Sequence, residues 1–166
     1  MPFTPFHLGP ALIIGLPLRK RIHAPTFIIA NVIVDIEPFL VLTYNLNYPL
    51  HGYLHTIVGA IILGLTLSCI MYVLRGSLDK LFKLLKLVEK GVNLKGFVTA
   101  GVGGTLIHVL LDSPIYSDIR PFYPLDVNPL YNPSLTPEIY LFCTITIMIG
   151  LVLYLIILIK EWYGRV

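Results

Sequence analysis

The chain has 166 residues, of which 56% are hydrophobic and only 13% are charged, and its mean hydropathy is +0.82. Soluble domains carry about 25% charged residues, so this composition excludes an ordinary water-soluble protein. The net charge of +3 fits contact with anionic membrane headgroups and calls for no nucleic-acid partner. The sequence predicts one integral membrane domain of the all-α class, covering residues 1–166.

Apolar segments follow one another along the chain and predict a polytopic helical bundle. A membrane span needs about 20 mainly apolar residues, a length that the second, third and fifth segments reach. The first and fourth are short and are expected to reach only part-way across or to recruit flanking residues. We expect about five transmembrane helices, at residues 4–18, 26–44, 53–74, 97–111 and 137–159.

Two connections have a distinctive composition. Residues 77–95 alternate Leu, Phe and Val with lysines at helical spacing, which predicts an amphipathic helix lying on the inner leaflet. Residues 113–136 contain five prolines, each of which fixes φ. This second connection is expected to form a stiff cap on the outer side.

The basic residues predict how the bundle is oriented. Of the 12 Lys and Arg residues, only Arg120 falls in a connection assigned to the outside. Because cytoplasmic loops carry an excess of Lys and Arg, the chain is expected in the cell membrane with its N-terminus outside and its C-terminus in the cytoplasm. His23 follows the basic stretch 19–21 and is expected to contact headgroups there.

Ionisable side chains within or beside the apolar segments collect at the predicted outer side. Such groups are costly in hydrocarbon unless they are paired or bound to metal, so they indicate a functional site. Imidazoles and carboxylates from several helices together favour a metal. The predicted ligands are His7, Asp35, His51, His55, His108 and Asp112.

Spacing supports this ligand set. His51 and His55 are four residues apart, so in a helix both imidazoles would face one direction, as a chelating pair must. His108 and Asp112 repeat the spacing, and Gly104, one turn earlier, would let a neighbouring helix approach closely. The alternative is that these pairs cap helices or tie them together by hydrogen bonds.

Asp35 and Glu37 are two residues apart and would lie on opposite sides of an ideal helix. Pro38 cannot donate a hydrogen bond to the carbonyl of Val34, so the helix should kink or unwind at this turn. Asp35 is then expected to bind the metal. Glu37 is expected either to act as a general base or to orient an imidazole.

The motifs resemble a known family. His7, the stretch Val-Asp-Ile-Glu at 34–37, His-Gly-Tyr-Leu-His at 51–55 and Gly-Thr-Leu-Ile-His-Val-Leu-Leu-Asp at 104–112 are similar to the membrane-bound metal-dependent hydrolases of the YdjM-like group. More distantly, they resemble zinc-dependent phospholipase C and P1 nuclease. The resemblance implies phosphoester hydrolysis at zinc. The chain differs in having Glu37 where Asp is commoner and in lacking a later His-x-x-x-Glu motif, so one or two metal ions are expected rather than three.

The expected function is hydrolysis of a lipid-like phosphorylated substrate near the outer leaflet, with membrane lipids as neighbours. Zinc suits mixed imidazole and carboxylate ligands, with manganese or iron as competitors. Glu37 or Asp118 would handle protons, and the Arg120 guanidinium would hold the phosphate. For Arg120 the alternative is an ion pair with Asp118 or Asp126 that stiffens the cap.

A second function class stays open at this point. A transporter or channel for divalent metal ions or protons would use the same cluster as a relay. It would also need a polar path to the cytoplasmic side, where the spans offer only Thr66, Ser68 and Thr99. Haem bound by two histidines would leave the carboxylates unexplained.

Overall fold

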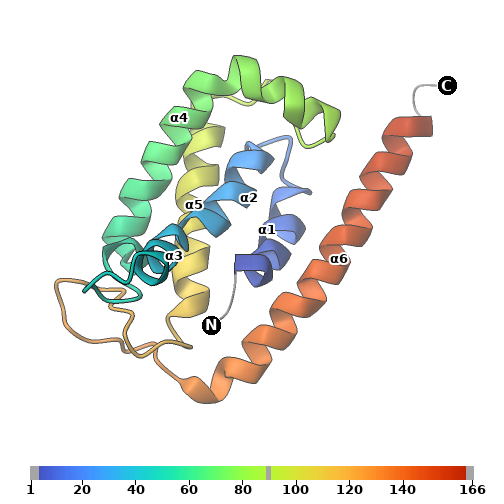
Figure 1. The fold of residues 1–166 in the computed structure, drawn as a ribbon. Helices are drawn as coiled ribbons and strands as arrows, with labels where there is room; N and C mark the ends of the chain where they lie inside the picture. Colours follow the sequence, from blue (N-terminus) through green and yellow to red (C-terminus); the bar gives the residue numbers. More distant parts are fainter. Residues whose placement is uncertain (1–3, 89–90, 164–166) are drawn as a thin grey trace.

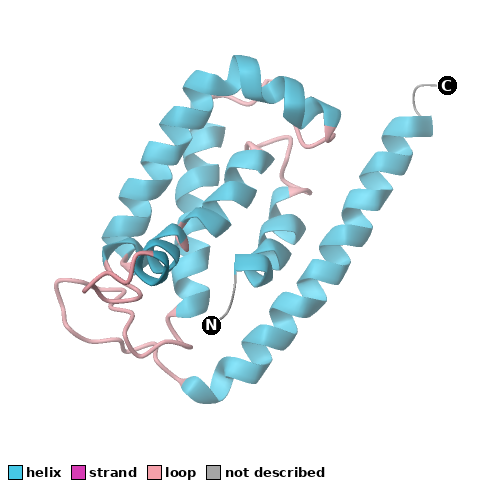
Figure 2. Cartoon of the chain, in the orientation of Figure 1, coloured by secondary structure: helices cyan, strands magenta, loops and turns pink. Residues whose placement is uncertain are grey.

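The computed structural model describes residues 4–88 and 91–163, and these residues form helices and connections without any strand (Figure 2). The all-α prediction is confirmed. In chain order the elements are η1 (Thr4–His7), α1 (Leu8–Gly15), α2 (Ala24–Ile33), α3 (Ile36–Thr43), η2 (Tyr53–His55), α4 (Ile57–Leu84), α5 (Leu94–Asp112), η3 (Pro133–Leu135) and α6 (Thr136–Tyr163).

Four helical segments are long and apolar enough to cross a membrane: Ala24–Thr43, Ile57–Leu84, Leu94–Asp112 and Pro133–Lys160. The first expected span is not among them. Its α-helix ends at Gly15, shortly before Pro17, and eight residues rise only about 12 Å. The hydrocarbon core of a bilayer is about 30 Å thick, so this helix is too short to cross it, and the other four expected spans correspond to helices that are long enough.

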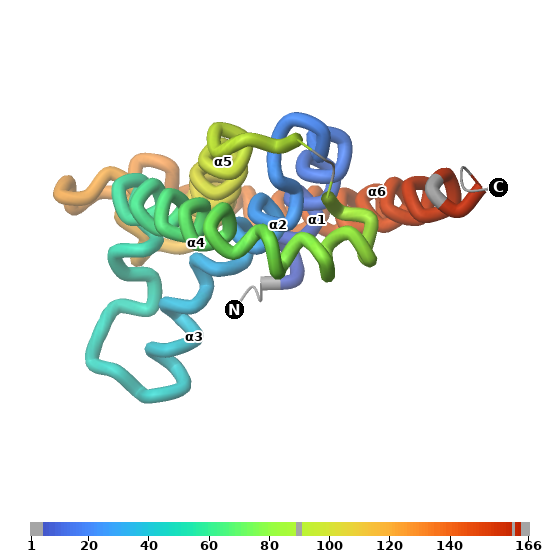
Figure 3. Tube along the Cα trace, turned by 90° about the horizontal axis from the view of Figure 1, so that it is seen from above, coloured from blue at the N-terminus to red at the C-terminus, as the bar shows by residue number. Residues whose placement is uncertain are grey.

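The second expected span is interrupted, as Pro38 predicts. α2 ends at Ile33 and α3 begins at Ile36. Between them the chain makes tight turns, in which Asp35 N donates to Val32 O at 3.2 Å and Glu37 N donates to Val34 O at 3.2 Å. After this break, α3 and the loop that follows project away from the other helices (Figure 3). The break leaves Asp35 at a corner of the backbone.

α4 begins later than the sequence suggests. The Thr56 side chain caps it, with Oγ1 accepting a hydrogen bond from Gly59 N at 2.9 Å. His55 therefore lies in η2 and His51 in the loop before it. The expectation that both imidazoles share one face of a helix is wrong, because the cap starts the helix only after both residues.

α4 also ends differently from the prediction for residues 77–95. Residues 77–84 continue α4, whose last part turns across the end of the bundle (Figure 1). Lys86 then adopts φ of 57°, and Leu87 N donates to Phe82 O at 3.0 Å, which closes the helix. Residues 89 and 90 lie outside the described part of the chain, and Asn93 caps α5. Thus no separate helix spans the described residues of 77–95.

α5 lies between α2 and α4 and approaches both closely, whereas α6 packs against α1 (Figure 1). A Cβ added at Gly64 of α4 would lie 2.7 Å from the Gly101 carbonyl oxygen. A Cβ at Gly104 would lie 2.8 Å from the Phe27 carbonyl oxygen of α2. These glycines let α5 carry His108 up to the break between α2 and α3.

Most of the described basic residues gather at one end of the bundle. The connection between α1 and α2, the end of α4 and the end of α6 lie at one end (Figure 1). These segments carry the basic residues 19–21, 75, 80, 83, 86 and 160. The loop before α4 and the long connection from α5 to α6 lie at the other end, which is where the predicted ligands gather.

Candidate metal centre

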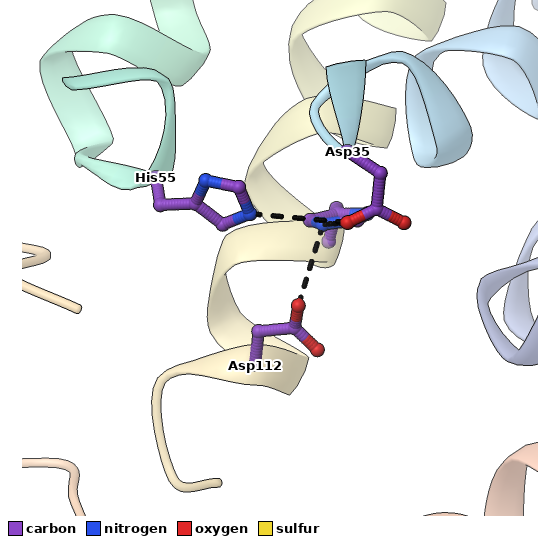
Figure 4. Close-up of side chains that lie close together, drawn as sticks. Asp35, His55 and Asp112 are labelled. Atoms are coloured by element: carbon purple, nitrogen blue, oxygen red, sulfur yellow. Dashed lines mark ion pairs between the residues drawn. The ribbon is translucent and has the colours of Figure 1, made fainter. Parts of the chain in front are cut away.

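Four of the six predicted ligands converge on one point. Asp35 comes from the break after α2, His55 from η2, and His108 and Asp112 from the last turns of α5. One ligand atom from each lies within 4.8 Å of all the others. Figure 4 shows Asp35, His55 and Asp112 pointing toward one another from three segments. Both imidazoles are fully buried, and 14% of the Asp35 side chain is exposed.

Hydrogen bonds orient both imidazoles so that Nε2 of each ring faces the other ligands. His108 Nδ1 donates to the carbonyl oxygen of Asn31 at 2.8 Å, and His55 Nδ1 donates to Glu37 Oε2 at 2.9 Å. In the neutral form of each ring the proton is then on Nδ1, and the lone pair of Nε2 faces inward. Both Nε2 atoms are buried and make no hydrogen bond within the described structure.

The separations fit a shared cation. His108 Nε2 lies 3.4 Å from an oxygen of Asp35 and 3.4 Å from an oxygen of Asp112, and His55 Nε2 lies 4.0 Å from Asp35 Oδ1. Two ligands that are each about 2.1 Å from a tetrahedral zinc ion lie about 3.4 Å apart. The group therefore has the donor atoms and approximately the spacing of a metal site.

The electrostatics point the same way. Two carboxylates in a largely buried space favour a positive charge beside them, which a bound cation would supply, because an unpaired buried charge is strongly unfavourable. Burial, the largest influence on His55, lowers the pKa of its imidazole even though the hydrogen bond to Glu37 opposes this. His55 is therefore neutral near pH 7, which is the form that binds a metal.

The other two predicted ligands lie beside this group. His7 Nε2 is 3.1 Å from Asp112 Oδ1, and the His7 ring stacks on that of His108 with centroids 3.9 Å apart. His51 faces Asp118 instead: its Nδ1 is 2.9 and 3.0 Å from the two carboxylate oxygens. Its ring centroid is 4.8 Å from that of His55. The structure thus brings His7 and His51 next to the group without placing them in it.

The residues predicted to act on the substrate occupy different surroundings. Glu37 is 8% exposed and accepts the His55 hydrogen bond, which favours the orienting role over the general-base role. Asp118 is partly exposed and holds His51. Arg120 is exposed and pairs with Asp126, which is also exposed, as in the alternative that the sequence left open.

Two contacts of the site have no signal in the sequence. Asn31 orients His108 through its backbone carbonyl, for which any residue type would serve. Tyr48 donates its hydroxyl to Glu37 Oε1 at 3.2 Å, a contact that depends on how the irregular loop before η2 folds back. Neither contact follows from spacing along a helix.

His23 lies at the opposite end of α2 and is not a headgroup contact. It is 2% exposed, its ring stacks on Phe97 with centroids 4.0 Å apart, and its Nδ1 accepts a hydrogen bond from Thr26 N at 3.4 Å. Its Nε2 is 3.4 Å from Asp79 Oδ1. Burial, the largest influence, lowers the pKa of this imidazole. His23 therefore caps α2 and joins it to α4 and α5.

No protein-family profile, no curated protein and no solved structure matches this chain.

Proposed function

We propose that this protein is a membrane-embedded, metal-dependent hydrolase that cleaves a phosphoester of a lipid-like substrate near the outer leaflet. One observation carries the proposal: two imidazoles with fixed Nδ1 protons direct their buried Nε2 lone pairs at a point shared with two carboxylates. The motif resemblance to YdjM-like hydrolases supports the choice of reaction.

The ligand set suits zinc, with manganese or iron as competitors. His55, His108, Asp35 and Asp112 would hold one ion. A second ion would have to draw on His7, which contacts Asp112 Oδ1, whereas His108 faces Asp112 Oδ2. A bound metal supplies two things to phosphoester hydrolysis, a water of lowered pKa and polarisation of a phosphoryl oxygen.

The side chains around the group would serve the substrate. Asp35 is the most exposed of the four ligands, so we assign the substrate to its side of the group. Asp118 contacts His51, which lies beside the group, and would handle protons. Arg120 would bind a phosphate only by exchanging its present partner, Asp126.

The membrane placement is part of the proposal. Four apolar helices are compatible with a membrane protein, and the basic segments lie at the end opposite the ligand group. With the basic end in the cytoplasm, the group would lie toward the outer leaflet, with the N-terminus outside and the C-terminus inside.

Cysteine labelling of intact cells tests this orientation. In a background with Cys69→Ser and Cys143→Ser, single cysteines replacing Asn47 or Asn132 should react with a membrane-impermeant maleimide added outside. Cysteines replacing Ser77 or Lys95 should react only after the cells are opened. The reverse pattern would place the ligand group on the cytoplasmic side and contradict the proposed orientation.

The reaction is tested with purified, zinc-loaded protein. Phosphatidic acid, phosphatidylcholine and a polyprenyl phosphate are incubated with the protein, and release of phosphate or headgroup is measured. Asp112→Ala should lose both zinc and hydrolysis. Arg120→Ala should keep zinc and hydrolyse more slowly, and Arg120→Lys should recover only part of the rate, because ammonium lacks the guanidinium fork.

Asp126→Ala is the matched control, since it breaks the same ion pair but leaves the guanidinium in place. It should hydrolyse at least as fast as the wild-type protein. Zinc-loaded wild-type protein that cleaves none of these substrates, yet moves divalent metal into liposomes, would overturn the hydrolase proposal in favour of transport.

A further inference from the structure

The Glu37 carboxylate is surrounded by hydrogen-bond donors. Oε1 accepts from Tyr48 OH at 3.2 Å and from Leu54 N at 3.1 Å. Oε2 accepts from Gly52 N at 2.9 Å and from His55 Nδ1 at 2.9 Å. Each oxygen therefore uses both of its lone-pair directions, and only 7% of the side chain is exposed. No lone pair of this carboxylate is left for a water or a substrate.

These four donors belong to one stretch of chain that lacks an α-helix to hold it. Residues 44–52 are irregular and η2 is a single turn, so neither sets the direction of the His55 ring by itself. Two backbone N–H groups, one hydroxyl and the imidazole all bond to Glu37, which stands on the first turn of α3. The carboxylate thus fixes both the loop and the ring that the loop carries.

The bond to His55 also decides which nitrogen faces the ligand group. A carboxylate only accepts, so it keeps the imidazole proton on Nδ1 and leaves Nε2 unprotonated. Nε2 is the atom that lies 4.0 Å from Asp35 Oδ1. Partners of this kind set ring orientation and raise the basicity of a ligating nitrogen.

We propose that Glu37 is a positioning residue that makes His55 a metal ligand, and that it does not itself touch the substrate. The proposal rests on the metal site of the proposed function but not on the reaction. The sequence leaves two roles open for Glu37, general base or orienting residue, and the proposal selects the second. The His51–Asp118 pair differs from the His55–Glu37 pair, because Asp118 is 42% exposed and His51 lies outside the ligand group.

Glu37→Gln tests the proposal with little change in shape. The amide oxygen can accept from only one pair of these donors. Where the amide nitrogen faces His55 Nδ1, it favours the proton on His55 Nε2, which then cannot bind metal, and where it faces Leu54 N, the loop that carries His55 loses a hydrogen bond. Zinc affinity, measured by competition with a chelating dye, should fall about 10- to 100-fold. The visible spectrum of the cobalt-substituted protein should change as well.

Tyr48→Phe is the matched control. It removes one hydrogen bond to Glu37 but leaves Oε2 and His55 in contact. If Glu37 acts through His55, this variant should bind zinc close to the wild-type affinity and give the wild-type cobalt spectrum. If Tyr48→Phe lowers the zinc affinity as much as Glu37→Gln does, Glu37 only holds the loop and the proposal is overturned.

Thermal midpoints of the metal-free proteins separate misfolding from the intended effect. Should Glu37→Gln not fold, Glu37→Asp carries the test with the same measurements, because it keeps an acceptor but shortens the reach to His55. Wild-type zinc affinity together with lost hydrolysis in a folded variant would show that Glu37 acts on the substrate and would overturn the proposal. If the wild-type protein binds zinc but hydrolyses nothing, the proposed function is wrong, and the test of Glu37 by zinc affinity still applies.

Discussion

The two ends of α2 each bury a histidine against a carboxylate, yet they differ in what the imidazole does. At the first end, His23 uses Nδ1 to cap α2, turns Nε2 to Asp79 and lies flat against Phe97. At the far end, His55 and His108 are both held at Nδ1 and both present Nε2 to Asp35. The first arrangement joins three helices, and since His23 Nδ1 accepts, its Nε2 carries the ring proton, whereas Nε2 of His55 and of His108 carries a lone pair.

The difference shows that a buried histidine beside an aspartate does not by itself indicate a metal. What distinguishes the far end is the number of converging ligand atoms and the position of the protons. At the first end one imidazole meets one carboxylate, whereas at the far end two imidazoles and two carboxylates share one point that a cation could occupy. Substitutions at the two ends should therefore affect different properties.

The largest difference is expected between His108→Ala and His23→Ala. Zinc at 100 times its Kd should stabilise the wild-type protein by about 2.7 kcal/mol, because metal bound only to the folded state shifts the equilibrium. His108→Ala should lose most of this gain, and His55→Ala should behave likewise. His23→Ala should keep it. Thermal midpoints in detergent with and without zinc provide the measurement, and an equal zinc response in all three variants would remove the distinction.

His23→Ala should instead lower the stability of the metal-free protein, by about 1–3 kcal/mol, since it removes a helix cap and leaves a cavity beside Phe97. The effect should depend on pH. Burial lowers the pKa of His23, so its neutral contacts stabilise the protein above about pH 6.5 and weaken as protonation is forced below it. The gap in midpoint between wild type and variant should narrow from pH 8 to pH 5. A gap that widens would contradict this assignment.

Helix spacing is expected to matter at the far end. A Cβ at Gly104 would press on the Phe27 carbonyl and on Ala30, so Gly104→Ala should push α5 away from α2 at an expense of about 1–3 kcal/mol. Because His108 lies one turn after Gly104 on α5, zinc affinity should fall too. Gly76→Ala is the control, since nothing lies within 4 Å of its added Cβ. Equal zinc affinity in the two variants would show that the site tolerates the displacement.

The smallest effect on stability is expected at Arg120. Its ion pair with Asp126 is exposed, and such pairs contribute about 0–1 kcal/mol. Arg120→Ala should leave both the thermal midpoint and zinc binding unchanged, so any loss of hydrolysis reports on substrate binding. A clear loss of zinc would show that the long connection after α5 supports the ligand group through this residue.

The sequence predicts the site better than the path of the chain. Asp35, His108 and Asp112 could be found because a proline marks the break and because helical spacing aligns the last two. His55 was predicted for a reason that does not hold, since Thr56 caps α4 after it. The contact of Glu37 with Gly52 and that of His51 with Asp118 could not be foreseen, because both depend on irregular loops. The extent of α1 was missed because apolar composition continues past Gly15 although the helix does not.

X-ray absorption at the zinc edge tests the central claim most directly. Protein purified without chelators and loaded with one equivalent of zinc should show only nitrogen and oxygen neighbours, at about 2.0–2.2 Å, with the scattering pattern of two imidazoles. His55→Ala should reduce the imidazole count to one. Sulfur neighbours, or a wild-type protein that retains no zinc, would contradict a metal centre built from Asp35, His55, His108 and Asp112.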